Sequence, residues 1–205
     1  MTGSFIVLEG PDASGTTRQS EFLAERMRKE GYDVVHTSEP TEGPVGKQIR
    51  SILQAKSLPA ADALQLLFTA DRAEHVQACI EPALRAGKVV ISDRYTLSTR
   101  IYGSALGLSA QWLQDINRLF PVPDLTLITL PPFEVCMERL AKREQRDQLE
   151  GTTFQRTVYE AYQKVEDPTT IFVDTSAEKM LVAEGIWKQV ERHFGPISRH
   201  SIAKL

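Results

Sequence analysis

The stretch of sequence that decides the fold is FIVLEGPDASGTTRQ, residues 5–19. It opens on an apolar run, as expected for a short strand that is buried on both faces. A turn of small residues follows, and a region of helical period begins at about Gln19. A strand, a glycine-containing loop and a helix in this order bring backbone N–H groups together at the positive end of the helix. The stretch therefore predicts a binding site for phosphate.

The loop from Gly10 to Thr17 has the length of the phosphate-binding pattern GxxxxGK[ST], but Thr16 stands in place of the lysine. A threonine cannot neutralise charge on a transferred phosphoryl group, so its presence should cost about 3 kcal/mol in the transition state. Arg18 either supplies the missing charge as a catalytic residue or simply faces solvent. The loop could also be no more than a tight connection between strand and helix. We expect nucleotide phosphates to contact Gly10, Ala13, Ser14, Gly15, Thr16 and Thr17, with the Thr17 hydroxyl on Mg²⁺.

Short β-branched runs alternate with longer stretches of helical period over the rest of the chain. This alternation is typical of parallel strands joined by helical crossovers. We therefore predict an α/β fold with a five-stranded parallel sheet flanked by helices, in a single domain over residues 1–205. The expected strands are residues 5–8, 34–37, 89–92, 125–130 and 171–174. The expected helices are residues 19–30, 61–85 with Asp62 as the cap, a helix opening at Ser109, 132–143, 153–164 and 179–194, before a weakly ordered tail at 195–205.

The composition argues against several classes of protein. A net charge of −3 and a pI near 5.9 do not favour a broad basic surface for nucleic acid. Two cysteines support neither a disulfide framework nor a metal cluster, and the first apolar run, which ends at Glu9, is too short for a signal sequence or a membrane span. We expect a cytoplasmic protein whose partners include no nucleic acid and no membrane.

Asp93, Arg94 and Tyr95 follow the third expected strand. In doubly wound sheets, ligands bind in the crevice at the carboxyl ends of the strands. The carboxylate of Asp93 suits Mg²⁺ at this place. The alternative is that Asp93 and Arg94 form a surface ion pair at the end of the strand.

Several segments together resemble the thymidylate kinases, in the same order and at similar spacing: FIVLEGPDASG, SEPTEGPVGKQIR, LLFTADRAEH, ISDRYTLSTRIYG and PDLTLITLPPFEVCMERLAKR. The resemblance extends to Trp187 and implies the three-layer P-loop kinase fold with a short helical lid at about residues 143–151. It implies transfer of a phosphoryl group from ATP to dTMP, giving dTDP and ADP, with Mg²⁺ as cofactor. It also implies a homodimer.

The resemblance assigns the acceptor site residue by residue. Arg50 matches an arginine that contacts the acceptor phosphate, Phe68 a ring that stacks on thymine, and Arg72 an arginine that hydrogen-bonds the base edge. A guanidinium that donates to a carbonyl oxygen discriminates thymine from cytosine. This chemistry supports the base-binding role of Arg72 independently of the resemblance. Phe68, in an apolar helix, could instead be a core residue. The other residues that the resemblance places near dTMP are Asp12, Glu39, Arg94, Tyr102 and Tyr162.

Three of these assignments leave alternatives open. Asp12 matches an acid near the acceptor sugar or the metal, and we count it among the catalytic residues, but it could be a turn-forming side chain. Tyr102 matches a tyrosine that closes over the sugar, yet Gly103 follows where the family commonly has glutamine, which puts base contacts from this segment in doubt. Tyr162 or Tyr159 matches a tyrosine beside the deoxyribose, or lies in the core or on the surface.

The remaining catalytic residues are expected at a strand end and in the lid. Asp93 matches an aspartate that positions metal or phosphate, and Arg94 an arginine that bridges the two phosphates. The family keeps a catalytic arginine either in the phosphate loop or in the lid, and Ala13 occupies the loop position. Of the three arginines in the charged segment that resembles the lid, Arg139, Arg143 and Arg146, the last two are the candidates. Each could instead be a solvated helix end.

Two other functions are compatible with the sequence. The missing glutamine after Tyr102 allows a kinase for another deoxynucleotide. The missing lysine at Thr16 allows a nucleotide-binding protein that is weakly active or non-catalytic. The retained Asp93 and acceptor-site arginines argue against this second alternative.

Overall fold

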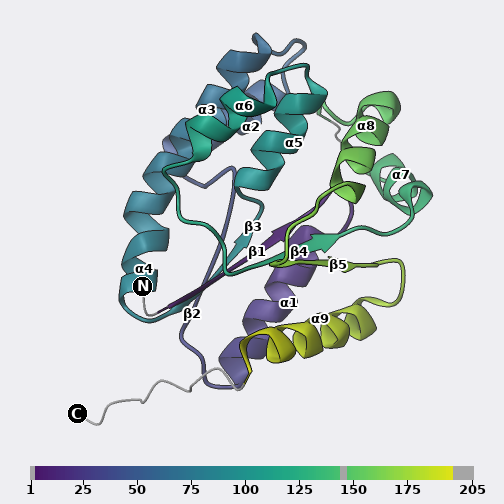
Figure 1. Ribbon diagram of the computed structural model, residues 1–205. Helices are drawn as coiled ribbons and strands as arrows, with labels where there is room; N and C mark the ends of the chain where they lie inside the picture. Colours follow the sequence, from purple (N-terminus) through teal and green to yellow (C-terminus); the bar gives the residue numbers. More distant parts are fainter. Residues whose placement is uncertain (1–2, 144–146, 196–205) are drawn as a thin grey trace.

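The computed structural model describes residues 3–143 and 147–195 (Figure 1). Its centre is a five-stranded sheet, all parallel, in the order β2-β3-β1-β4-β5. This confirms the predicted parallel sheet, and every strand begins and ends within about one residue of its predicted position. The strands are β1 (Ser4–Glu9), β2 (Val34–Ser38), β3 (Val89–Asp93), β4 (Leu125–Thr129) and β5 (Thr170–Val173).

Helices cover both faces of the sheet, which gives the three layers seen in Figure 1. Ile6 and Leu8 of β1 pack in one core with residues of α1 and α9, whereas Phe5 and Val7 pack in a second core on the opposite face. A strand that is buried on both faces is expected to be largely apolar, as β1 is from Phe5 to Leu8. The helices of the described residues are α1 (Thr16–Lys29), α2 (Pro44–Leu53), α3 (Ala61–His75), α4 (Glu81–Arg85), α5 (Thr96–Ala105), α6 (Ala110–Asn117), α7 (Phe133–Ala141), α8 (Thr152–Gln163) and α9 (Lys179–Phe194).

The long helix expected for residues 61–85 is interrupted in its middle. Residues Val76–Ile80 form a π-helical turn between α3 and α4. Asp62 is not the cap of α3, because Ala60 occupies the cap position. Asp62 lies in the first turn, where its carboxylate accepts a hydrogen bond from the N–H of Ala63 at 2.8 Å and adds negative charge near the positive end of the helix.

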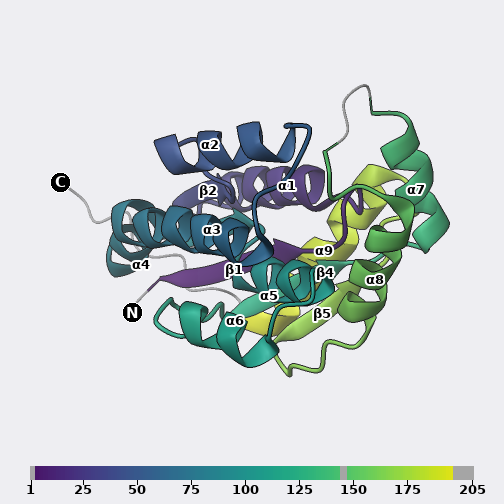
Figure 2. The ribbon, with the colours of Figure 1, turned by 90° about the horizontal axis from the view of Figure 1, so that it is seen from above.

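Two helices were not predicted. In α2, which lies beside α3 (Figure 2), Pro44 and Gly46 obscure the helical pattern, and Gly46 is required because a Cβ there would lie 2.0 Å from the Thr41 carbonyl oxygen. In α5, no side chain near the start caps the helix. The buried carboxylate of Glu9 on β1 does so instead, accepting from the backbone N–H of Tyr95 at 2.9 Å and of Ser98 at 3.2 Å.

The expected lid differs from the prediction in its local structure. Its described part, residues 147–151, is a turn and not a helix, and α7 and α8 lie on either side of it. Arg146 and the tail from residue 196 lie outside the described residues. Within the part of the chain that the structure describes, no helix is both long and apolar enough to cross a bilayer.

Candidate functional site

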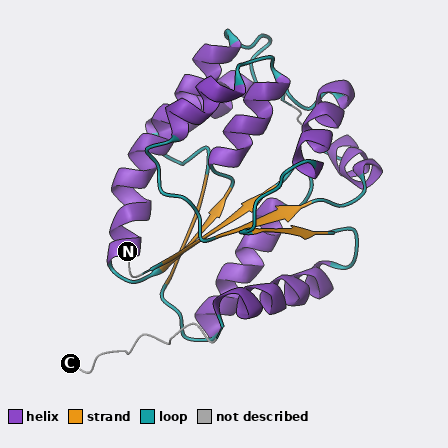
Figure 3. Cartoon of the chain, in the orientation of Figure 1, coloured by secondary structure: helices purple, strands orange, loops and turns teal. Residues whose placement is uncertain are grey.

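A cavity of about 1280 Å³ opens at the carboxyl ends of the central strands. The arrowheads of the strands in Figure 3 mark this end of the sheet, and the loops that follow β1 and β3 begin there. The cavity collects most of the residues that the sequence singled out. Its lining includes Asp12, Ala13, Gly15, Thr16, Thr17, Arg18, Glu39, Arg50, Phe68, Arg72, Asp93, Arg94, Tyr102 and Arg143.

The loop between β1 and α1 has the backbone of a phosphate-binding turn. Ala13 and Gly15 have positive φ angles, 59° and 104°, which turn the chain into the helix. Gly10 also has to be glycine, because a Cβ there would lie 2.5 Å from the Thr129 carbonyl oxygen. Among the described residues, the N–H groups of Gly15, Thr16 and Thr17 donate to no backbone oxygen outside the helix. They are free donors at the positive end of α1.

The side chains of Ser14 in this loop and of Arg18 in α1 do not face the proposed phosphate position. Ser14 is fully buried, and its hydroxyl hydrogen-bonds the Thr129 hydroxyl at 2.7 Å, so its side chain anchors the loop to β4 and does not face a ligand. Arg18 lies in the first turn of α1, at the edge of the cavity. Its Nη1 pairs with Glu21 at 3.0 Å, its guanidinium carbon lies 5.7 Å from the centre of the Phe22 ring, and its side chain is 58% exposed. In this arrangement Arg18 does not take the place of the missing lysine.

The hydroxyl of Thr17 and the carboxylate of Asp93 meet at the end of β3. Thr17 Oγ1 donates to Asp93 Oδ2 at 2.5 Å. Asp93 is buried, and its Oδ1 has no hydrogen-bond partner among the described residues. A buried carboxylate oxygen without a partner is unfavourable unless a cation or water is bound there. These oxygen ligands fit Mg²⁺, which prefers hard oxygen donors and keeps several waters.

Arg94 connects the phosphate loop with the rest of the cavity. Its Nη1 donates to the Gly10 carbonyl at 2.9 Å and to the Ser98 hydroxyl at 3.1 Å, and its Nη2 donates to the Asp12 carboxylate at 2.6 Å. Its φ of 69° is unusual for a residue other than glycine, and such strain concentrates at functional sites. The guanidinium carbon lies 5.4 Å from the centre of the Tyr102 ring. Arg94 is thus fixed in place and faces the cavity.

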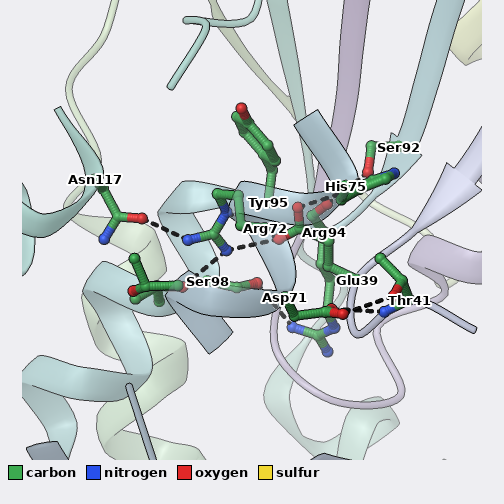
Figure 4. Close-up of polar contacts among 12 residues, drawn as sticks. Glu39, Thr41, Asp71, Arg72, His75, Ser92, Arg94, Tyr95, Ser98 and Asn117 are labelled. Carbon is green, nitrogen blue, oxygen red and sulfur yellow. Dashed lines mark hydrogen bonds and ion pairs between the residues drawn. The ribbon is translucent and has the colours of Figure 1, made fainter. Parts of the chain in front are cut away.

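A buried polar network lies at the other end of the cavity (Figure 4). Arg72 is 1% exposed, and it donates from Nε at 2.9 Å and from Nη2 at 2.7 Å to Glu39. Its other donor groups reach Thr99 at 2.9 Å and Asn117 at 2.5 Å. His75 hydrogen-bonds the second oxygen of Glu39 at 2.9 Å. Glu39 therefore holds Arg72 and His75 together and neutralises the buried guanidinium.

Comparison with known proteins shows similarity over most of the chain to one family. The model of the thymidylate kinase family matches residues 8–186. The chain is 43% identical over 172 residues to a probable thymidylate kinase from Thermococcus kodakarensis, covering 78% of this chain and 83% of the relative. It is 45% identical over 148 residues to a probable thymidylate kinase from Pyrococcus abyssi, covering 70% of this chain and 72% of the relative. A thymidylate kinase from Ectopseudomonas mendocina is 43% identical over 170 residues, covering 79% and 81% of the two chains.

The chain belongs to the thymidylate kinase family. The three-layer α/β architecture agrees with the P-loop kinase fold that this membership implies.

Phe68 and Arg50 lie where an acceptor-binding role is possible. Phe68 is half-buried and lines the cavity, so part of its side chain is accessible from the cavity. Arg50 is held by the carbonyl oxygens of Pro40 at 2.7 Å and Thr41 at 2.6 Å, and it also pairs with Glu42 at 2.8 Å. The turn after β2 thus presents the guanidinium at the edge of the cavity.

The departure from the thymidylate kinase family pattern at Gly103 has a packing explanation. A Cβ on Gly103 would lie 2.6 Å from a methyl group of Leu113 on α6. Gly103 is buried and is absent from the cavity lining, whereas Tyr102 lines it. Glycine at this position therefore allows α5 to pack closely on α6, and position 103 does not contribute to the lining of the cavity.

Tyr162 does not reach the cavity. It is fully buried, and its hydroxyl donates to Glu9 at 3.0 Å, because the buried carboxylate needs donors. Glu9 also accepts from the Ser98 hydroxyl at 2.5 Å. Burial raises the pKa of Glu9, and the hydrogen bonds from Ser98 act in the opposite direction. Tyr162 thus takes the core position that the sequence left open, and it stabilises the floor of the site.

The segment before α8 is tied to the phosphate loop by Gln155. Its amide oxygen accepts from the N–H of Asp12 at 3.2 Å, and its amide nitrogen donates to the Asp12 carboxylate at 2.6 Å and to the Leu149 carbonyl at 2.9 Å. Arg143 pairs with the buried Glu150 in the same segment. Sequence reasoning missed Gln155, Asn117 and His75, because their partners lie far away in the chain and no local pattern marks them.

Proposed function

We propose that the protein transfers a phosphoryl group from ATP to dTMP, giving dTDP and ADP. The observation that carries the proposal is a single cavity with a phosphate-binding loop at one end and a buried arginine beside an open aromatic ring at the other. Arg94 lies between these two ends and faces both. The names of the relatives, probable thymidylate kinase and thymidylate kinase, support the same reaction.

The proposed acceptor site recognises thymine by its shape and its carbonyl groups. The ring of Phe68 offers a stacking surface, and base–aromatic stacking contributes about 1–3 kcal/mol. Arg72 keeps one N–H of Nη1 beyond those bonded to Glu39, Thr99 and Asn117. A guanidinium donates to a carbonyl and not to the amino group of cytosine, which favours thymine and uracil.

In the proposed reaction, an oxygen of the dTMP phosphate forms a bond to the γ-phosphorus of ATP, and the bond from that phosphorus to the β,γ-bridging oxygen breaks. The acceptor is already an anion, so no general base is required. Positioning and charge stabilisation are the main tasks of the protein. Arg94, fixed by Asp12 at 2.6 Å, contacts both phosphates, and Arg143 adds charge from the segment before α8.

Mg²⁺ is the proposed cofactor. Thr17 and Asp93 would hold it, and it supplies positive charge to the phosphate oxygens when bound. The hydrogen bond of 2.5 Å between these two side chains, which brings the start of α1 to the end of β3, supports this assignment.

The proposal also includes a cytoplasmic homodimer that acts on small nucleotides. Leu66 on α3 is 50% exposed, as expected of an apolar side chain that a second copy would cover. Light scattering coupled to size exclusion measures this directly, and a monomer at micromolar concentration would contradict the dimer.

Release of ADP in a coupled assay with ATP, Mg²⁺ and dTMP tests the reaction. We expect turnover with dTMP, slower turnover with dUMP, and none with dCMP or thymidine. Binding of ATP and dTMP without ADP release would instead identify a non-catalytic nucleotide-binding protein. Faster turnover with dCMP than with dTMP would contradict the role of Arg72.

A further inference from the structure

The arginines around the cavity differ in how their charge is neutralised. Six line it, and five of these pair with carboxylates: Arg18 with Glu21, Arg50 with Glu42, Arg72 with Glu39, Arg94 with Asp12, and Arg143 with Glu150. Arg139, on α7, pairs with no carboxylate among residues 3–143 and 147–195. A half-buried guanidinium without a counter-ion is a preferred site for an anion.

Arg139 rests against the phosphate loop. Its Nη2 donates to the Thr175 carbonyl at 2.7 Å, and its Nη1 lies 3.4 Å from the Ala13 carbonyl and 3.5 Å from the Ser14 carbonyl. Thr175 is buried, and its hydroxyl donates in turn to Ser14. A Cβ built on Gly15 would lie 3.9 Å from Nη1. The guanidinium is therefore beside the residue that precedes Thr16.

The donors of Arg139 are incompletely used. The contacts of Nη1 with loop carbonyls are long, and Nε and one N–H of Nη2 have no acceptor in the described parts of the chain. A phosphate oxygen is a stronger acceptor than a carbonyl oxygen. The side chain can thus turn toward an anion on the loop without breaking an ion pair.

We propose that Arg139 contacts the phosphates of the donor nucleotide and supplies the positive charge that the loop lost when threonine took the place of lysine at Thr16. The inference rests on the proposed function. Arg18, which the sequence offered either for this role or as a solvent-facing residue, is paired with Glu21 and is 58% exposed. Lys179 also lines the cavity and is exposed, so it is the competing cation.

The first experiment measures binding by calorimetry, with ADP, AMP and adenosine as probes. Arg139→Met should weaken ADP binding about 10- to 100-fold, as expected for the loss of a hydrogen-bonded charge, and should weaken adenosine binding much less. Arg139→Lys should retain part of the ADP affinity. Arg156→Met, which removes an arginine from the neighbouring helix α8, is the matched control and should leave all three affinities unchanged. An equal loss of ADP and adenosine affinity would overturn the proposal.

The second experiment is a rescue at the loop. Thr16→Lys should restore ADP affinity and turnover in the Arg139→Met background, and should raise them much less in the parent protein, because the two cations serve the same phosphates. The KM for dTMP should stay unchanged. Failure of the rescue, or a larger loss of ADP affinity in Lys179→Met or Arg18→Met, would show that Arg139 is only a structural link to Thr175. Thermal unfolding of each variant identifies any that fails to fold.

The two proposals can fail separately. If the parent protein binds ADP and dTMP but forms no dTDP, the proposed function is wrong, whereas the ADP and adenosine affinities still decide the role of Arg139. If dTDP forms and Arg139→Met binds ADP as the parent does, only the role of Arg139 is wrong.

Discussion

Phe68 and Arg72 lie one helical turn apart on α3, yet their surroundings differ. Phe68 is half-buried at the cavity, whereas Arg72 is 1% exposed and has four of its five N–H groups bonded to protein side chains. Replacement of each should therefore have a different effect. Phe68→Ala should raise the KM for dTMP about 10- to 100-fold through lost stacking, with little change in thermal stability. Steady-state kinetics and a melting curve measure the two effects, and a large drop in the melting temperature would place Phe68 in the core.

Arg72→Met should act mainly on folding. It leaves Glu39 buried without its strongest partner, and removal of one member of a buried ion pair costs about 3–5 kcal/mol. Denaturant titration measures this loss. The double variant Arg72→Met with Glu39→Gln should be more stable than Arg72→Met alone. If it is equally unstable, the carboxylate is not the reason for the loss.

The titration of Asp147 should also make the free energy of unfolding depend on pH. Burial raises the pKa of this carboxyl to about 6, with a further contribution from nearby Asp12. The unfolded value is about 3.9, so the folded state holds the proton more tightly. The resulting stabilisation is fully present below about pH 4 and is lost as the pH rises through about 6. Asp147→Asn keeps the acceptor for the Leu149 N–H and should be about 1–2 kcal/mol more stable than the parent at pH 8, with almost no difference at pH 4. A difference that does not depend on pH would contradict the raised pKa.

Among the helices, the contact of α5 with α6 should affect the stability of the fold and not the activity. Gly103→Ala would place a methyl group 2.6 Å from a methyl of Leu113, and such overpacking costs about 1–3 kcal/mol. The kinetic constants for dTMP should not change, because this side of α5 faces away from the cavity. The double variant with Leu113→Ala should lose less stability than the sum of the single variants. A changed KM for dTMP would show that position 103 communicates with the acceptor site.

The elements that could be predicted from the sequence are those whose signals are local. The strands are apolar runs bounded by turn residues, and they were placed within about one residue. The helix α5 was missed because its cap, Glu9, lies on β1, and no local pattern reveals it. The same difference between local and distant partners decides which residues of the site could be predicted. The phosphate loop and Asp93 follow strands directly, whereas Gln155 and Arg139 reach the loop only through the folding of α7 and α8 onto it.

At the scale of the whole molecule, the two ligands should stabilise one folded unit. In the proposed function, donor and acceptor bind at opposite ends of the same cavity, which only the folded chain forms. ADP or dTMP at about 100 times its dissociation constant should add about 2.7 kcal/mol to the free energy of unfolding. Thermal denaturation with each ligand and with both measures this. No shift with either ligand, at concentrations that saturate binding, would contradict the assignment of the cavity.

The amide of Gln155 has a consequence for motion within the molecule. It holds both the main chain and the side chain of Asp12 while it also holds the carbonyl of Leu149. Outward movement of the segment that contains Leu149 would therefore either break its hydrogen bond to Gln155 or displace Asp12 and the phosphate loop with it. The position of residues 147–151 is thus coupled to the conformation of the turn where the phosphates would bind.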